Sequence, residues 1–278
     1  MAMPSIGERE VKCIQRATEE TSVNVQTRPA RQDAVLHDLF ARNPIGQDVA
    51  TAWSGLKQTL LDIAKEVSAR NVLEIGAGRH PFLIDEADQH GFELTINDID
   101  ANELDYAPVG PRRLIFDISS TIDDTEIPRG QFDLVFSRMV FEHVPDARRA
   151  WNNLFELLAP GGVGFAFVPT LFSPPFVINR LIPEAVSSRL LYSLDRTRTI
   201  AEIPKFPAFY DYCRASEKAL QPMLEEIGYR EVLVLPFFGT PYFPRIPVLR
   251  HAAKMLDNIA EKRDWRIFAS YAYIMARR

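Results

Sequence analysis

Short apolar runs alternate with amphipathic segments along the middle of the chain. The apolar runs are rich in β-branched and aromatic residues and end at glycine or polar residues, a pattern typical of buried strands. Five of them are expected as strands, over residues 72–75, 92–96, 113–116, 131–137 and 163–168. Residues 47–67 and 147–158 carry apolar side chains at helical spacing and are expected as helices. The alternation predicts an α/β fold, in which a parallel sheet has helices on both faces.

The last part of the chain continues this alternation after a long connection. Residues 217–227 and 248–262 are expected as helices, and residues 230–235 and 267–276 as the sixth and seventh strands. The connection, residues 169–214, holds many prolines and aromatic residues, and a connection this long inside a compact domain is usually functional. Its aromatic residues would equally suit a homodimer interface or a simple hydrophobic cover.

These patterns divide the chain into four parts around one core. Residues 1–44 are expected to be an N-terminal arm, because most of them are polar and weakly periodic. Residues 45–168 form the main core, and residues 169–214 are an insertion. Residues 215–278 complete the core sheet.

The composition is that of an ordinary globular protein without an excess of basic residues. Of the 278 residues 46% are hydrophobic and 25% charged, and the net charge is −5, which argues against a nucleic acid as the main partner. Cys13 and Cys213 give neither a disulfide framework nor a zinc spacing, so no metal site is predicted and a cytoplasmic setting is expected. The N-terminus lacks the apolar core of a signal peptide. Glu156, prolines and glycines interrupt the longest apolar region, so no transmembrane segment is expected.

The most informative stretch is a glycine turn directly after the first expected strand. Gly76, Ala77 and Gly78 follow Ile75, and Pro81 is expected in the first turn of the next helix. Glycine accepts positive φ and lets a ligand approach the backbone, while the amides of a helix N-terminus favour an anionic group. The turn indicates a nucleotide-like cofactor, although an ordinary strand-to-helix turn would use the same residues.

Two further positions bear on which cofactor this is. A dinucleotide fingerprint requires its third glycine at position 81, where this chain has Pro81. Asp98 follows the second expected strand, 22 positions beyond Gly76, where a carboxylate can accept hydrogen bonds from both ribose hydroxyls of an adenosine-containing ligand. The alternative for Asp98 is a cap on the helix that begins near Ala101.

In these features the chain resembles the class I S-adenosylmethionine-dependent methyltransferases. Their first motif, acid-x-Gly-x-Gly-x-Gly, is matched by Glu74, Gly76 and Gly78, with His80 in place of the usual third glycine. Their fourth motif is matched by Phe-Asp-Leu-Val in the fourth expected strand and by His143-Val-Pro-Asp after it. The resemblance implies a Rossmann-like, seven-stranded, mostly parallel sheet, with a lid that recognises the acceptor after the fifth strand.

The resemblance also implies a cofactor site at the ends of the first four strands. In the family an acid placed like Asp117, after the third strand, typically holds the adenine amine, although Asp117 could merely cap a turn. The residues expected to bind S-adenosylmethionine are Glu74, Gly76, Ala77, Gly78, Asp98, Ile99, Asp117, Ile118 and Ser137.

Methyl transfer from S-adenosylmethionine needs no metal, because the sulfonium already activates the methyl group. For an alcohol or phenol acceptor a general base is useful, and His143 is the first candidate because it follows the strand end that should border the methyl. A structural histidine that fixes the next helix is the alternative role of His143, and His80, Tyr210 and Tyr212 are the reserve candidates. The expected function is O-methylation of a small molecule with an apolar or aromatic part, such as a natural-product, lipid-linked or sugar-linked intermediate.

Two other functions compete with this expectation. One is a catalytically silent interaction module, and three acids at successive strand ends, Glu74, Asp98 and Asp117, count against it. The other is a nicotinamide-dependent oxidoreductase, against which Pro81 counts.

Overall fold

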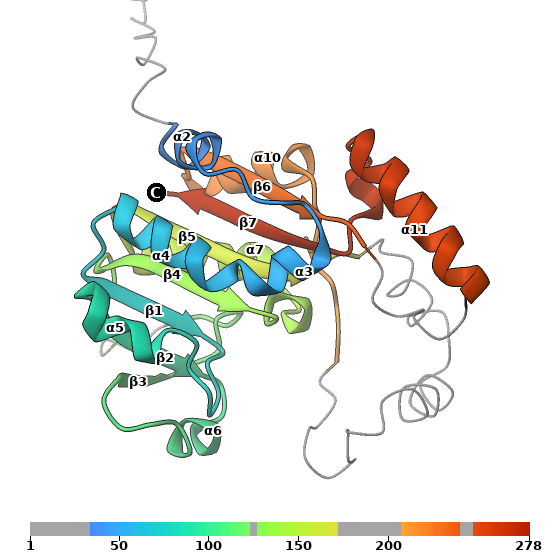
Figure 1. Cartoon of the computed structure of the whole chain (residues 1–278). Coiled ribbons are helices and arrows are strands. Elements are labelled where there is room, and N and C mark those ends of the chain that lie inside the picture. The colour runs from blue at the N-terminus through green and yellow to red at the C-terminus, as the bar shows by residue number, and fades with distance from the viewer. Residues whose placement is uncertain (1–33, 123–126, 172–206, 240–246) are drawn as a thin grey trace, which may run out of the picture. The chain divides into compact units, whose positions relative to one another are not determined.

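The computed structural model describes residues 34–122, 127–171, 207–239 and 247–278 (Figure 1). All of them belong to one compact unit, Ala34–Arg278. A seven-stranded sheet lies at its centre, with helices on both faces. In these described ranges no helix is long and apolar enough to cross a membrane.

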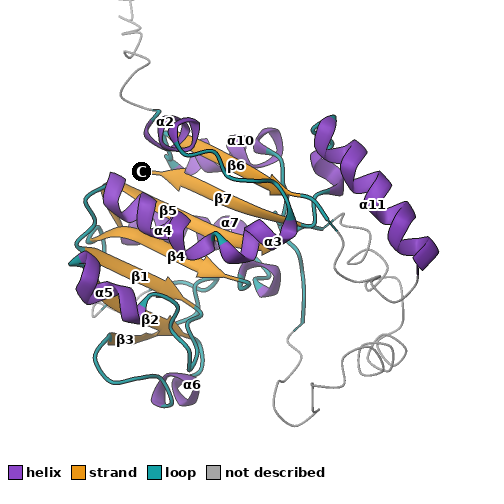
Figure 2. Ribbon diagram, in the orientation of Figure 1, coloured by secondary structure: helices purple, strands orange, loops and turns teal. Residues whose placement is uncertain are grey.

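The strands of the sheet follow the order β3-β2-β1-β4-β5-β7-β6. Their bounds are β1 Asn71–Ile75, β2 Glu93–Asp98, β3 Arg112–Ile115, β4 Phe132–Arg138, β5 Leu158–Pro169, β6 Glu231–Phe237 and β7 Tyr271–Arg277. Strand β7 is antiparallel to its neighbours β5 and β6, and the remaining pairs are parallel, as the opposed arrow of β7 in Figure 2 shows. The predicted fold class, a Rossmann-like, mostly parallel sheet of seven strands, is confirmed.

Helices cover the two faces of the sheet. Their bounds are α2 Val35–Arg42, α3 Val49–Ser54, α4 Leu56–Glu66, α5 Ile84–His90, α6 Ala101–Asp105, α7 Ala147–Leu157, α10 Glu217–Ile227 and α11 Pro247–Lys262. Two short 3-10 helices, η1 Phe141–His143 and η2 Arg266–Phe268, follow β4 and α11. Helices α3, α4 and α5 lie on one face, and α7 and α10 on the other (Figure 1).

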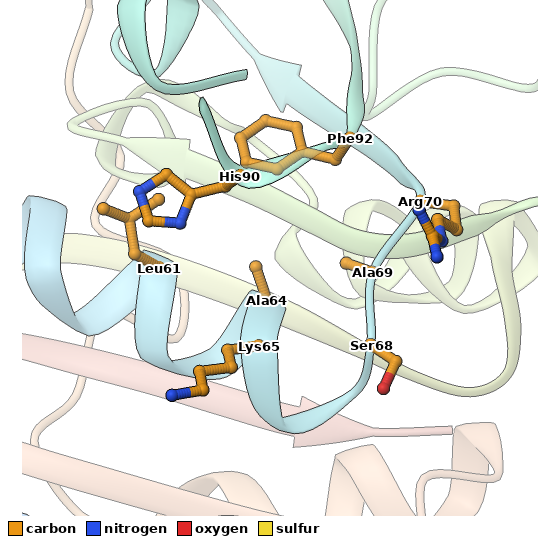
Figure 3. Close-up of a pocket in the computed structure, with 8 residues that line it drawn as sticks. All are labelled: Leu61, Ala64, Lys65, Ser68, Ala69, Arg70, His90 and Phe92. Atoms are coloured by element: carbon orange, nitrogen blue, oxygen red, sulfur yellow. The ribbon is translucent and has the colours of Figure 1, made fainter. Parts of the chain in front are cut away.

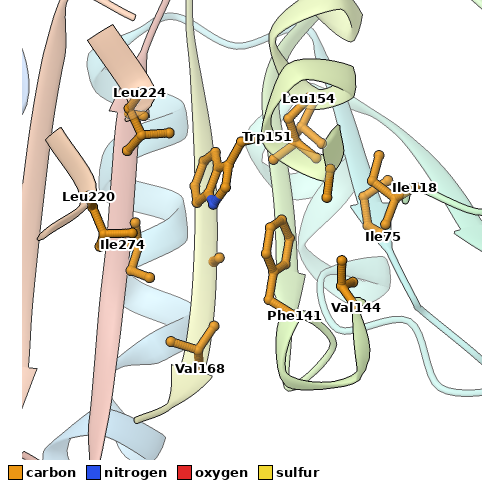
Figure 4. Packing of buried hydrophobic residues seen from close by; sticks show 14 of the residues in the cluster. Ile75, Ile118, Phe141, Val144, Trp151, Leu154, Val168, Leu220, Leu224 and Ile274 are labelled. Atoms are coloured by element: carbon orange, nitrogen blue, oxygen red, sulfur yellow. The ribbon is translucent and has the colours of Figure 1, made fainter. Parts of the chain in front are cut away.

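The core consists of two apolar layers, one on each face of the sheet. In β4, Val135 belongs to the layer under α7 and Phe136 to the layer under α4, because successive side chains of a strand point to opposite faces. In the first layer the fully buried ring of Trp151 lies 5.2 Å from that of Phe141 and 5.9 Å from that of Tyr229, between ring centroids. Figure 4 shows Trp151 between the leucines of α10 and Phe141. This packing fixes η1, and with it the loop after β4, against the core.

Three of the predicted segments differ from the structure. The strand predicted over residues 267–276 begins only at Tyr271, because Arg266–Phe268 form the 3-10 helix η2. The helix predicted over residues 47–67 is two helices, α3 and α4, which are separated at Gly55, a residue type of low helix propensity. Helix α2 lies within the expected arm, residues 1–44, and three of its apolar side chains are buried in the core layer under α4. The compact unit therefore begins at Ala34, while the preceding residues lie outside the described ones.

The expected insertion, residues 169–214, is described only at its two ends. The Leu171 N–H donates to the carbonyl oxygen of Cys213 (3.0 Å), so the chain returns beside the point where it leaves β5. The Phe209 N–H donates to the carbonyl oxygen of Glu142 (2.7 Å) in η1. The two described ends thus lie side by side and the returning end contacts the loop after β4, while the rest of the expected lid lies outside the described residues.

Candidate functional site

The candidate site lies where the carboxyl ends of β1, β2, β3 and β4 meet. Ile75 of β1 is paired with Asn97 of β2 and with Ser137 of β4. Asp98 of β2 is paired with Ile115 of β3. The strand order reverses between β1 and β4, and ligands of open α/β sheets bind outside the carboxyl ends of the strands at such a point.

Backbone N–H groups of the glycine loop after β1 hold this loop against β2. Gly76 and Gly78 have φ values of 68° and 55°, which favour glycine. The Ala77 N–H donates to a carbonyl oxygen of β2 (2.9 Å), and the Gly78 N–H donates to Asp98 Oδ2 (3.0 Å). A Cβ on Gly76 would overlap Cγ2 of Val140, so the loop also lies against the segment after β4.

Glu74 supports the same loop from the interior. Its side chain is buried, and Oε2 accepts a hydrogen bond from the Phe82 N–H (2.7 Å). Burial raises the pKa of Glu74 from 4.5 to about 7, while the Phe82 N–H and the charge of Arg138 oppose that rise. Because the Phe82 amide is bonded to Glu74, residues around it form a turn and α5 begins only at Ile84. The prediction that Pro81 lies in the first turn of this helix is therefore wrong.

Asp98 faces the glycine loop from the end of β2. Its Oδ1 accepts from the Asp100 N–H (3.0 Å), and its Oδ2 accepts from Gly78. An ionised carboxylate has about four acceptor positions, so two are left for a ligand. The cap of α6 is Asp100, which accepts from the Asn102 N–H (2.9 Å), rather than Asp98. Ile99, beside these acceptors, is 65% exposed and offers apolar surface.

Asp117 follows β3 and is partly buried. Its Oδ1 accepts from the N–H and the hydroxyl of Ser119 (2.8 and 2.7 Å), and its Oδ2 accepts from the hydroxyl of Ser120 (2.8 Å). Burial acts to raise the pKa of Asp117, but these hydrogen bonds together outweigh it and lower the pKa below its ordinary value. The side chain of Ile118 is buried in the core, so a contact with a cofactor would have to come from its backbone.

Asn153 of α7 supports this turn, and the sequence reasoning missed it. Its buried side-chain amide donates to the carbonyl oxygens of Ile118 (2.7 Å) and Ser120 (2.8 Å). These two bonds fix the turn that carries Asp117. The signal that could have revealed Asn153 is a polar residue on the apolar face of the predicted helix.

Strand β4 ends in two polar residues, Ser137 and Arg138. Ser137 is fully buried, and its hydroxyl has no hydrogen-bond partner within the described ranges. Arg138 is partly buried, and its guanidinium carbon lies 4.6 Å from the ring centroid of Phe82. Ser137 was predicted as a site residue, whereas Arg138 was missed because a single cation at a strand end matches no motif.

Glu142 and His143 lie in η1, directly after β4. Glu142 is 4% exposed, burial raises the pKa of its carboxyl to about 7, and Oε2 has no hydrogen-bond partner in the described part of the chain. The His143 side chain is 37% exposed, with Nδ1 2.8 Å from the carbonyl oxygen of Pro207 and Nε2 3.8 Å from Glu142 Oε1. Because a carbonyl only accepts hydrogen bonds, Nδ1 carries the proton of neutral His143 and Nε2 is its basic nitrogen.

The reserve candidates lie at two places around this edge. His80 is an exposed residue of the glycine loop. Tyr210 and Tyr212 belong to the segment that packs on η1, and both have positive φ, 54° and 51°. Between them, Asp211 Oδ2 accepts from the Ala147 N–H (2.9 Å) at the start of α7. This segment is therefore hydrogen-bonded to both η1 and α7.

Two cavities lie at the opposite edge of the sheet. The smaller, of about 250 Å³, lies between the carboxyl ends of α4 and α5 (Figure 3). In Figure 3 the side chains of Lys65 and Ser68 point away from His90 and Phe92, and helix carboxyl ends carry partial negative charge that disfavours an anion. The larger, of about 540 Å³, is lined by the amino ends of β2, β3 and β4. Neither cavity contains a predicted site residue.

Comparison with known proteins gives matches over most of the described chain. A family model described as a methyltransferase domain matches residues 45–233. Methyltransferase str3 of Strobilurus tenacellus is 31% identical over 93 residues, so the chain spans about a third of the length of this curated relative. An S-adenosylmethionine-dependent methyltransferase of Mesorhizobium loti, at 18% identity, superposes on 84% of this chain and 100% of its own with a TM-score of 0.50. A SAM-dependent methyltransferase of Archaeoglobus fulgidus, at 17% identity, covers 80% of this chain and 94% of its own with a TM-score of 0.46.

Proposed function

Since this chain belongs to the family of S-adenosylmethionine-dependent methyltransferases, we propose that it transfers the methyl group to an oxygen atom of a small molecule. The observation that carries the proposal is the convergence of Glu74, Asp98 and Asp117 with the glycine turn at one edge of the sheet. Ionisable groups placed around one such edge suit a ligand site better than a silent scaffold. Pro81 stands where a nicotinamide dinucleotide site needs glycine, which disfavours an oxidoreductase.

The residues of the edge fit an adenosine-containing cofactor. The two remaining acceptor positions of Asp98 suit the two ribose hydroxyls, and the exposed side chain of Ile99 suits the adenine face. Asp117, whose pKa is lowered, remains ionised at neutral pH and suits the adenine amine as an acceptor. The buried hydroxyl of Ser137 suits a polar group of the cofactor, since buried polar atoms are normally hydrogen-bonded.

When bound, the cofactor supplies a methyl group that its sulfonium has already activated. The chain's own residues then have to align the acceptor with that methyl and remove the acceptor proton. We assign proton removal to Nε2 of His143, because the bond from Nδ1–H to Pro207 fixes the ring and leaves Nε2 basic. Glu142, when ionised, stabilises the imidazolium formed by this transfer, since its Oε1 lies 3.8 Å from Nε2.

The acceptor is proposed to bind beside η1, against the returning end of the insertion. Phe209 is 46% exposed and Tyr212 37% exposed, and together they offer aromatic surface next to His143. This surface supports an acceptor with an apolar or aromatic part, and the proposal gives the choice of acceptor to the insertion, residues 169–214.

Calorimetry and a turnover screen test this function. We expect S-adenosylhomocysteine to bind with micromolar affinity and NAD far more weakly. Asp98→Ala should weaken S-adenosylhomocysteine binding by about 1.5–3 kcal/mol, the range for hydrogen bonds to a charged group, while Asp88→Ala on the exposed surface of α5 should not. Release of S-adenosylhomocysteine should be faster with alcohols and phenols than with matched amines. Tighter binding of NAD than of S-adenosylhomocysteine would contradict the proposal.

A further inference from the structure

Arg138 is a cation at the site without an anionic partner in the described part of the chain. Two other cations nearby are neutralised: Lys57 forms an ion pair with Glu86, and the Arg79 guanidinium is bonded to both carboxyl oxygens of Glu103. The Arg138 guanidinium, in contrast, makes no hydrogen bond or ion pair to any described residue. A partly buried guanidinium of this kind is suited to an anion that arrives with a ligand.

The surroundings of Arg138 orient its guanidinium group. It is the last residue of β4, and its guanidinium lies over the Phe82 ring, 4.6 Å from the centroid. The Lys57 ammonium lies 5.6 Å from the same ring. Stacking on an aromatic face holds the guanidinium plane while leaving N–H groups at its edge for a planar oxyanion. A carboxylate can accept two parallel hydrogen bonds from such an edge.

The charge of Arg138 acts on Glu74 and opposes the rise of its pKa, but Glu74 does not neutralise Arg138. The two side chains form no ion pair, and Glu74 Oε2 accepts from the Phe82 N–H instead. The pKa of Glu74 is about 7, so at neutral pH this carboxyl is ionised in only part of the molecules. The positive charge of Arg138 beside the glycine loop is therefore compensated only in part.

We propose that Arg138 binds a ligand carboxylate, namely that of the methionyl part of S-adenosylmethionine. The inference rests on the proposed function. An acceptor that carries a carboxylate is the other source of the same chemistry. The position of Arg138 against Phe82 favours the cofactor, because Phe82 belongs to the loop at which the cofactor is proposed to bind, whereas the acceptor is assigned to η1.

Two ligands that differ in the methionyl part test the proposal by calorimetry. S-Adenosylhomocysteine carries the carboxylate, and 5′-methylthioadenosine lacks the whole amino-acid part. Arg138→Gln should weaken S-adenosylhomocysteine binding about 10- to 100-fold, as expected for a charge-assisted hydrogen-bonded pair, and change methylthioadenosine binding less than 3-fold. Arg138→Lys keeps the charge beside Glu74 and should bind S-adenosylhomocysteine less tightly than the wild type, since it loses the planar fork. Arg42→Gln, at the exposed end of α2, removes the same charge and should leave both affinities unchanged.

Each outcome has a separate meaning. Failure of the wild type to bind either adenosine ligand would overturn the proposed function. Unchanged S-adenosylhomocysteine affinity in both Arg138 variants would overturn the cofactor assignment. In that case benzoate is titrated into the S-adenosylhomocysteine complex, to test whether the carboxylate comes from the acceptor. Weaker benzoate binding in Arg138→Gln than in the wild type would assign the carboxylate to the acceptor. Equal benzoate binding would reject an anion site at Arg138. Circular dichroism of both variants checks that they are folded.

Discussion

The buried carboxyl of Glu142 should make the protein less stable as the pH rises. In the folded chain burial raises the pKa of Glu142 from 4.5 to about 7, whereas in the unfolded chain the carboxyl is in water. Between these two values the folded state binds more protons than the unfolded state, so the free energy of unfolding falls with increasing pH. The contribution is fully present below about pH 4.5 and is lost as the pH passes through 7. Each pKa unit corresponds to about 1.4 kcal/mol, so the loss is about 3 kcal/mol.

Glu142→Gln removes this titration while keeping the shape of the side chain. The new amide has hydrogen-bonding needs of its own, and these would cost about 1–3 kcal/mol if unmet. That cost does not depend on pH, so it cancels when the variant's stability is compared at two pH values. We therefore expect the difference in unfolding free energy, variant minus wild type, to rise by about 3 kcal/mol between pH 4.5 and pH 8.5.

Urea denaturation at constant ionic strength measures this difference. Glu74 has the same direction of shift, but it is present in both proteins and its contribution cancels. Glu225→Gln, on the exposed surface of α10, is the matched control and should leave the pH dependence of stability unchanged. A difference between Glu142→Gln and wild type that stays constant from pH 4.5 to 8.5 would refute the reasoning, because Glu142 would then be as well solvated in the folded chain as in the unfolded one.

The remaining predictions concern the loops around the site. His143→Ala should lower the turnover number with a hydroxyl acceptor about 10²- to 10⁴-fold, with S-adenosylhomocysteine affinity changed only a few-fold in calorimetry; His90→Ala is the exposed control, and a folded variant with wild-type turnover would remove His143 as the base. Gly76→Ala should destabilise the protein by about 2–5 kcal/mol in denaturation, from positive φ and from overlap with Val140; adding Val140→Ala should recover only the overlap, and full recovery would show that φ is not strained. Asn153→Ala should lower stability by about 1–3 kcal/mol and also weaken S-adenosylhomocysteine binding, since both hydrogen bonds to the Asp117 turn are lost; stability loss without a binding effect would separate this turn from the cofactor.

The local sequence was sufficient to predict that strands and helices alternate and that acids follow successive strands. The spacing of apolar residues differs between strands and helices, and glycine marks the turn after β1. These features therefore follow from residues that are close together in the sequence. The alternation also implies parallel strands, whose carboxyl ends share one edge. The sequence alone therefore predicts that Asp98 and Asp117 lie at one edge of the sheet. The boundaries were less certain, as Gly55 shows by dividing one predicted helix into two.

What the tertiary structure alone decided is which polar groups face one another across that edge. The sequence places Glu74 at a strand end, but only packing buries its carboxyl and joins it to the Phe82 amide. Asn153 and Arg138 lie in segments with no motif, and their roles depend on a turn and a ring contributed by other elements. Burial and hydrogen bonding between residues far apart in the chain depend on how the layers of the fold pack. Local periodicity carries no information about the distances between such residues.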